Sequence, residues 1–118
     1  EDPAMQSFYS EVAVIKESLS HMQQKLTSLQ NSHEESKTTT KAERMKEIRA
    51  TMDTDITEVG RQAQDVKARL EALDVANEEA RSKKGKGPGS SQDRTRTSIT
   101  NGMRKKLTKI LSDFQDLR

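Results

Sequence analysis

The sequence has no cysteine and no tryptophan, only two prolines, and aromatic residues make up 3% of its 118 positions. Without cysteine it can form no disulfide framework, thiolate nucleophile, zinc–cysteine site or iron–sulfur cluster. No apolar run approaches the ~20 residues that a membrane-spanning helix needs, and no signal-peptide-like segment opens the sequence. As given, the sequence predicts a soluble, cytosolic chain.

Charged side chains make up 34% of the residues, more than the 30% of apolar types. Because 21 basic and 19 acidic groups nearly cancel to +2, the composition is closer to that of long amphipathic helices than to that of a disordered chain. The length suffices for one small domain. With so few apolar residues, a core can form only if they are concentrated in stripes.

The clearest stripe lies in the first third of the sequence and predicts a helix over residues 5–33. Its spacings alternate between four and three, a heptad pattern with a mean period of about 3.5 residues. The stripe consists of Phe8, Val12, Ile15, Leu19, Met22, Leu26, Leu29 and His33. Residues 1–4 read as an expression scar before a natural start near Met5, and residues 38–40 break the pattern.

A second stripe predicts a helix over residues 41–81, and Thr40 and Glu43 have the spacing of a capping box at its start. Gly60 lies off this stripe and should cost about 1 kcal/mol relative to alanine. The stripe consists of Met45, Ile48, Met52, Ile56, Val59, Ala63, Val66, Leu70, Leu73, Asn77 and Ala80.

A third stripe predicts a helix over residues 93–118, with Gly102 on the opposite side. It consists of Ile99, Met103, Leu107, Ile110, Phe114 and Leu117. Since the pattern still runs at Arg118, we expect this helix to be truncated. Residues 82–92 are rich in glycine and predict a flexible loop within the domain.

Three amphipathic helices with short connections predict an all-α fold for residues 5–118. The expected architecture is an antiparallel up-down-up three-helix bundle, left-handed as the heptad period implies. Three helices can close one apolar core, whereas two would leave their seam half exposed. The isolated domain is therefore expected to be monomeric.

No constellation of catalytic or metal-binding residues stands out. His21 and His33 have no partner at ligand spacing. Carboxylate pairs such as Asp53 and Asp55 are interpreted as a solvated helix face rather than as an acid–base pair. We therefore expect no enzyme activity, no metal and no cofactor.

The charges are unevenly distributed along the sequence. Residues 1–80 carry ten basic and sixteen acidic groups, whereas residues 81–109 carry ten basic groups and one acidic group. The second segment predicts a basic patch that either is simply solvated or faces an anionic membrane or an acidic partner. Specific nucleic-acid binding is less favoured, because no aromatic residues interleave for stacking. The expected patch comprises Lys83, Lys84, Lys86, Arg94, Arg96 and Lys106.

The stretch from Arg94 to Ser98 also resembles a site for basophilic kinases. Thr97 and Ser98 are the hypothetical phosphorylation sites, at the start of the third helix, where a phosphate beside arginines would be electrostatically favourable. Short matches of this kind are frequent by chance.

Several segments together resemble the N-terminal Habc domain of plant plasma-membrane syntaxins, which are Qa-SNAREs. The resemblance covers residues 5–118, and residues 93–107 are its most specific part. The segments are His33-Glu34-Glu35-Ser36-Lys37-Thr38, Leu70-Glu71-Ala72-Leu73-Asp74, Asp93-Arg94-Thr95-Arg96-Thr97-Ser98, Thr100-Asn101-Gly102, Arg104-Lys105-Lys106-Leu107 and Phe114-Gln115-Asp116-Leu117-Arg118. The sequence departs from the family in lacking a Gly-Cys pair in its second loop and in the early end of its third helix.

The resemblance implies a regulatory module rather than a catalyst. Such domains can fold back on their own SNARE helix, which lies in the groove between the second and third helices and is thereby withheld from SNARE assembly. Implied partners are this helix, a Sec1/Munc18-type regulator, cognate SNAREs and tethering or priming factors. The implied location is the cytoplasmic side of the plasma membrane or the cell plate, with the anchor outside this sequence. The expected groove residues are Arg61, Lys67, Arg104 and Lys105.

Two alternatives remain open. A structural coiled-coil or adaptor segment predicts a concentration-dependent dimer in ultracentrifugation. A phosphate-binding or anionic-lipid-binding helical domain predicts affinity for nucleic acid or anionic liposomes that falls steeply with salt.

Overall fold

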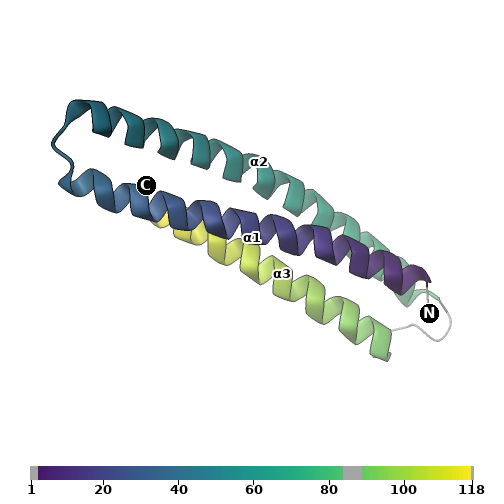
Figure 1. Ribbon diagram of the computed structural model, residues 1–118. Helices are drawn as coiled ribbons and strands as arrows, with labels where there is room; N and C mark the ends of the chain where they lie inside the picture. The colour runs from purple at the N-terminus through teal and green to yellow at the C-terminus, as the bar shows by residue number, and fades with distance from the viewer. Residues whose placement is uncertain (1–2, 84–88, 118) are drawn as a thin grey trace.

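A computed structural model of the protein describes residues 3–83 and 89–117. It contains three helices, α1 (Pro3–Thr38), α2 (Ala42–Arg81) and α3 (Ser91–Asp116). They run up, down and up in a rod measuring 66 × 20 × 19 Å, as Figure 1 shows. The predicted all-α three-helix bundle is confirmed. Because α3 has 26 residues against 36 in α1 and 40 in α2, it covers only part of the hairpin that α1 and α2 form.

The apolar stripes form the core, as the heptad spacing predicts. Ile15 and Met22 of α1, Val66 of α2 and Ile110 of α3 are completely buried. Met52, in the N-terminal part of α2, is only half-buried. Met52 lines a surface hollow together with Leu111 and Phe114 of α3, whereas Ile48, one turn closer to the connection between α1 and α2, is buried.

The first helix is longer than predicted at its C-terminal end. It continues to Thr38, where the Ser36 hydroxyl donates to the His33 carbonyl and the Thr38 and Thr39 hydroxyls donate to the Glu35 carbonyl. These short polar side chains bond to carbonyls of the last turn, where intrahelical partners run out. Sequence spacing alone located the apolar stripe but not this polar extension.

The predicted capping box at the start of α2 is wrong. The N-cap residue is Lys41, one position after Thr40, and its side chain makes no capping hydrogen bond. Instead, an ion pair crosses the turn between the helices, with Arg44 Nη2 2.8 Å from Glu35 Oε1. The hydrogen bond from Arg44 lowers the pKa of Glu35 below its ordinary value.

The start of α3 is capped by side chains. Ser90 is the N-cap residue, and its hydroxyl accepts a hydrogen bond from the Asp93 amide at 3.1 Å. The Asp93 carboxylate in turn accepts from the Gly89 amide and from Arg81 Nε, the latter at 2.6 Å. Gly89 has a φ of +83°, a left-handed conformation that favours glycine. Helix α3 therefore begins two residues before the predicted start.

The first residues of the described chain belong to the fold. Pro3 opens α1, where its missing amide hydrogen removes no helical bond. The Ala4 carbonyl accepts a hydrogen bond from Arg96 of α3. Residues 3 and 4, which the sequence interpretation set aside with residues 1–4, thus take part in the bundle.

Candidate functional site: grooves on either side of the third helix

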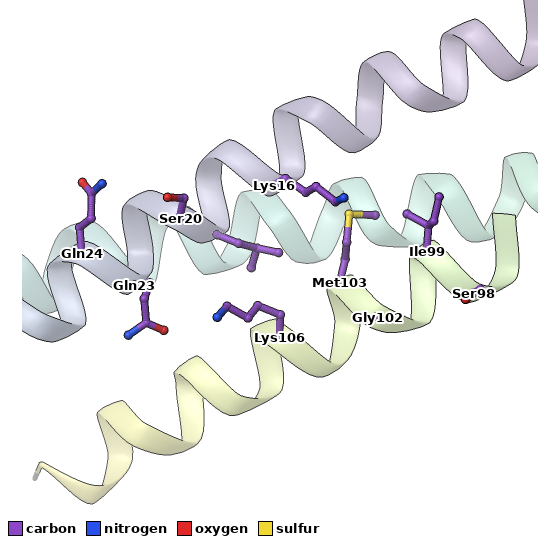
Figure 2. Close-up of a pocket in the computed structure, with 10 residues that line it drawn as sticks. Lys16, Ser20, Gln23, Gln24, Ser98, Ile99, Gly102, Met103 and Lys106 are labelled. Carbon is purple, nitrogen blue, oxygen red and sulfur yellow. The ribbon is translucent and has the colours of Figure 1, made fainter. Parts of the chain in front are cut away.

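Two surface grooves flank α3. The α2/α3 groove lies near the C-terminal end of α3 and has a volume of about 220 Å³. Its lining is almost entirely apolar, with Met52, Ile56 and Gly60 from α2 and Leu111 and Phe114 from α3. The α1/α3 groove lies on the other side of α3, is larger, at about 570 Å³, and is shown in Figure 2.

Gly60 keeps one wall of the α2/α3 groove free of side chain. A Cβ atom built at this position would meet no heavy atom within 4 Å, so the packing of the bundle does not require glycine there. A glycine in a helix interior costs about 1 kcal/mol relative to alanine. The residue therefore weakens α2 locally and leaves the groove open.

Polar contacts cross the seam between α2 and α3 outside this groove. Arg104 Nη2 lies 2.6 Å from Asp74 Oδ2, and Arg81 pairs with Asp93 and donates to the Thr97 hydroxyl at 3.0 Å. The arginine hydrogen bond lowers the pKa of Asp93, helped by the Gly89 amide. These contacts bridge α2 and α3 on the N-terminal side of the α2/α3 groove along α3.

The four predicted groove residues divide into two pairs. Arg104 lies on the seam, where it pairs with Asp74. Lys67 is grouped with it because Lys67 lies seven residues before Asp74 and therefore has the same heptad position on α2. Arg61 and Lys105 are exposed, and each follows a buried core residue by two positions. Two positions correspond to about 200° around a helix, so both side chains belong to the outer faces of their helices.

Arg96 does not contribute to an exposed basic patch, because only 5% of its surface is accessible. Its guanidinium lies 5.1 Å from the centre of the Phe8 ring, and its Nη1 donates to Asn77 Oδ1 at 3.2 Å. Asn77 Nδ2 donates to the Thr100 hydroxyl at 3.1 Å. This polar cluster joins all three helices inside the bundle, which corrects the assignment of Arg96 to the surface.

The other described members of the expected basic patch do not share one surface. Lys83 lines a groove between α1 and α2, Arg94 is exposed on α3, and Lys106 lines the α1/α3 groove. Lys84 and Lys86 lie outside the described residues. The net positive charge of this segment is therefore divided among several faces.

The two hypothetical phosphorylation sites have different surroundings. Thr97 is half-buried and accepts a hydrogen bond from Arg81, whereas Ser98 is exposed at the edge of the α1/α3 groove. They are the seventh and eighth residues of α3, so neither reaches the free amide groups of its first turn. The expected placement at the start of the helix is thus wrong.

Asp55 is buried, so the prediction that Asp53 and Asp55 both belong to a solvated helix face is wrong for Asp55. Its carboxylate accepts from the Ser28 hydroxyl at 3.2 Å and lies 3.6 Å from Lys25 Nζ. The pKa of Lys25 is raised, first by Glu58 and then by Asp55. Asp55 therefore belongs to a polar seam that joins α1 to α2.

Within the described ranges, no group of three or more histidine, cysteine or acidic side chains is placed to hold a metal ion. None of the helices in these ranges contains an apolar stretch long enough to cross a membrane. His21 instead shares a hydrogen bond with Gln62 across the α1–α2 seam, at 2.7 Å.

Sequence comparisons match residues 2–118 to the syntaxin family model. The chain is 43% identical to Syntaxin-132 of Arabidopsis thaliana over 117 residues, which is 99% of the chain and 38% of that relative. It is 42% identical to Syntaxin-122 over 114 residues (97% and 33%) and 35% identical to the syntaxin-related protein KNOLLE over 117 residues (99% and 36%), both from the same plant. The chain thus spans less than two-fifths of these relatives, and no solved structure matches it significantly. With almost its entire length matched by the family model, the chain belongs to the syntaxin family.

Proposed function

We propose that the chain is the N-terminal regulatory (Habc) domain of a plant syntaxin. In this role it controls how often the SNARE helix of its parent protein is available for SNARE complex assembly. Membership of the syntaxin family supports a SNARE-related role in vesicle fusion. The observation that carries the regulatory part of the proposal is the α2/α3 groove, an apolar hollow in the surface of a bundle whose core is otherwise closed.

An amphipathic helix is the occupant that this groove suits. A helix that lays its apolar stripe between α2 and α3 would cover Met52, Ile56, Leu111 and Phe114, which the bundle alone leaves partly exposed. Because the apolar lining lies at Leu111 and Phe114, the occupant would contact the C-terminal half of α3 most closely.

Regulation follows from the difference in free energy between the closed and open states. A net gain of about 2.8 kcal/mol on docking would maintain a hundredfold excess of the closed state. Partner SNAREs would then compete for the same helix, and any factor that binds the open state more tightly would promote assembly. We infer that a Sec1/Munc18-type regulator and tethering or priming factors act in this way, at the plasma membrane or the cell plate.

The test is a titration of the parent's SNARE helix into the domain, followed by amide chemical shifts. We expect shifts at residues that line the α2/α3 groove and smaller ones on the outer face of α2, where Val75 is 59% exposed. Unchanged shifts along α2 and α3 would contradict the proposal.

A matched pair of variants sharpens this test. Gly60→Trp adds a large side chain at a residue that lines the groove, and its Cβ would meet no atom of the bundle within 4 Å, whereas Gly60→Ala adds one methyl group. Both replace glycine with a better helix former, so neither should unfold α2. We expect the tryptophan variant to lose binding and the alanine variant to keep it.

A further inference from the structure

The α1/α3 groove has an apolar floor between two polar rims. Leu19 of α1 and Ile99 and Met103 of α3 form the floor, and no carboxylate is among its described lining residues. The lining runs from residue 16 to residue 24 on α1, a length of about 12 Å along the helix. These dimensions suit two to three turns of an additional helix, on the opposite side of α3 from the groove assigned to the SNARE helix.

The rims of this groove are cationic. Lys16 lies on α1 and Lys106 on α3, and Figure 2 shows both side chains reaching into the space between the two helices. Within residues 3–83 and 89–117, neither ammonium group lies within 4 Å of a carboxylate, whereas Lys25 and Lys109 each form an ion pair. The carboxylate next in sequence, Glu17, lines a different hollow, on the α1–α2 side.

Gly102 has the same relation to this groove as Gly60 has to the other. Gly102 lies in the middle of α3 and lines the groove beside Ile99 and Met103, so its expected position opposite the apolar stripe is wrong. A Cβ atom built there would meet nothing within 4 Å. The bundle therefore packs equally well with a side chain at this position, although glycine weakens the helix. The absence of a side chain leaves the groove accessible to an incoming backbone or side chain.

We propose that the α1/α3 groove binds an acidic amphipathic helix of a partner protein. Its apolar stripe covers Leu19, Ile99 and Met103, and glutamate or aspartate side chains on its flanks pair with Lys16 and Lys106. Charge complementarity carries the choice of occupant, because Lys16 and Lys106 flank the apolar floor and no carboxylate is among the described lining residues.

A membrane surface suits this site less well than a helix does. The apolar floor lies between two helices and is concave, whereas a bilayer presents a broad surface that would touch the lysines before the floor. The proposal concerns a site distinct from the α2/α3 groove, so it can fail or succeed independently of the proposed regulatory function.

The experiment uses two synthetic helical peptides of about 18 residues, a length that gives roughly five helical turns. Both carry leucines at i, i+3, i+4 and i+7; one has glutamates on its flanks and the other has lysines. Each is titrated into the full 118-residue chain, with affinity measured by calorimetry and the site located by amide chemical shifts. We expect the glutamate peptide to bind at least about tenfold more tightly, with shifts around Leu19 and Met103.

Variants assign the site. Gly102→Trp should abolish binding of the glutamate peptide, and Gly102→Ala and Gly60→Trp should leave it within about twofold. The double substitution Lys16→Glu and Lys106→Glu should reverse the preference between the two peptides. Since all four positions are exposed, the fold should tolerate these changes, and thermal unfolding provides the check.

Three results would overturn the proposal. Equal affinities of the two peptides would show that Lys16 and Lys106 contribute nothing to binding. Shifts that are confined to α2, or that persist unchanged in Gly102→Trp, would place the binding elsewhere. Binding to phosphatidylserine vesicles through Lys16 and Lys106, or self-association through the groove, with no binding of the glutamate peptide, would assign another occupant.

Discussion

Arg94 and Arg96 are two residues apart in one basic stretch, yet the structure predicts very different effects of replacing them with alanine. Arg96 is buried against Phe8 and bonded to Asn77, whereas Arg94 is exposed. Arg96→Ala would leave Asn77 Oδ1 without its guanidinium donor and open a cavity next to the aromatic ring. Arg94→Ala would remove only a solvated side chain.

The expected loss of stability in Arg96→Ala follows from the contacts of its guanidinium. A hydrogen bond from a charged group contributes about 1.5–3 kcal/mol, and a cation–π contact adds about 0.5–2 kcal/mol when it is desolvated. The burial cost of the guanidinium, which has no carboxylate partner in the cluster, offsets part of this gain. We therefore expect Arg96→Ala to lower the free energy of unfolding by about 3 kcal/mol, or the melting temperature by about 12 °C for a domain of this size. Arg94→Ala should stay within about 0.5 kcal/mol of the parent chain.

Urea denaturation followed by circular dichroism measures both free energies. A double-mutant cycle between Arg96 and Asn77 should give a coupling energy above about 0.5 kcal/mol, because the two side chains are in contact. Equal losses of stability for Arg94→Ala and Arg96→Ala would contradict the burial of Arg96 and place both arginines on the surface.

Three further predictions concern the core, the acid response and the assembly. Ile15→Ala should cost about 2–5 kcal/mol in chemical denaturation because Ile15 is fully buried, whereas Val14→Ala, at a position 41% exposed, should cost under about 1 kcal/mol. Arg81 holds the pKa of Asp93 below its ordinary value, so this carboxylate stabilises the fold above about pH 4 and loses its contribution as the pH falls through its folded-state pKa. A carbon-detected NMR titration should show the Asp93 pKa rising in Arg81→Met, and an unchanged value would contradict the assigned cause. Sedimentation equilibrium should give a monomer at all concentrations, because the apolar stripes are buried within one chain; a concentration-dependent dimer would favour the coiled-coil alternative.

The heptad spacing was enough to predict the three helices and most of the core. Residues such as Ile15, Met22 and Val66 can be assigned to the interior because a repeat of about 3.5 residues leaves one face of each helix apolar. The number of stripes then determined the number of helices, and the short connections determined the up-down-up order.

Polar residues on the same face were harder to assign. Arg96 is seven residues before Met103, so its heptad position is internal, but its charge favours a surface interpretation. Its partners, Phe8 and Asn77, lie far away in the sequence, and only the packed bundle brings them together. Asp55 was misassigned for the same reason, because Lys25 and Ser28 lie on another helix.

The grooves also needed the structure. Gly60 and Gly102 could be recognised in the sequence as glycines off the stripes, with a cost to helix stability. Which helices they lie between depends on the rotation of each helix in the bundle, and this rotation cannot be read from spacing alone. The predicted capping box is wrong by one residue: Lys41 and not Thr40 is the N-cap of α2, and this shift decides which side chain can cap the helix.

The proposed regulation predicts a difference in the rate at which the proposed parent protein assembles with partner SNAREs. The measurement compares the cytosolic region of the parent protein, containing this domain and its SNARE helix, with its Gly60→Trp and Gly60→Ala variants. If the α2/α3 groove holds the SNARE helix in the closed state, Gly60→Trp should assemble at least about tenfold faster, and Gly60→Ala should match the parent protein. Equal rates for all three proteins would show that the α2/α3 groove does not restrain the SNARE helix.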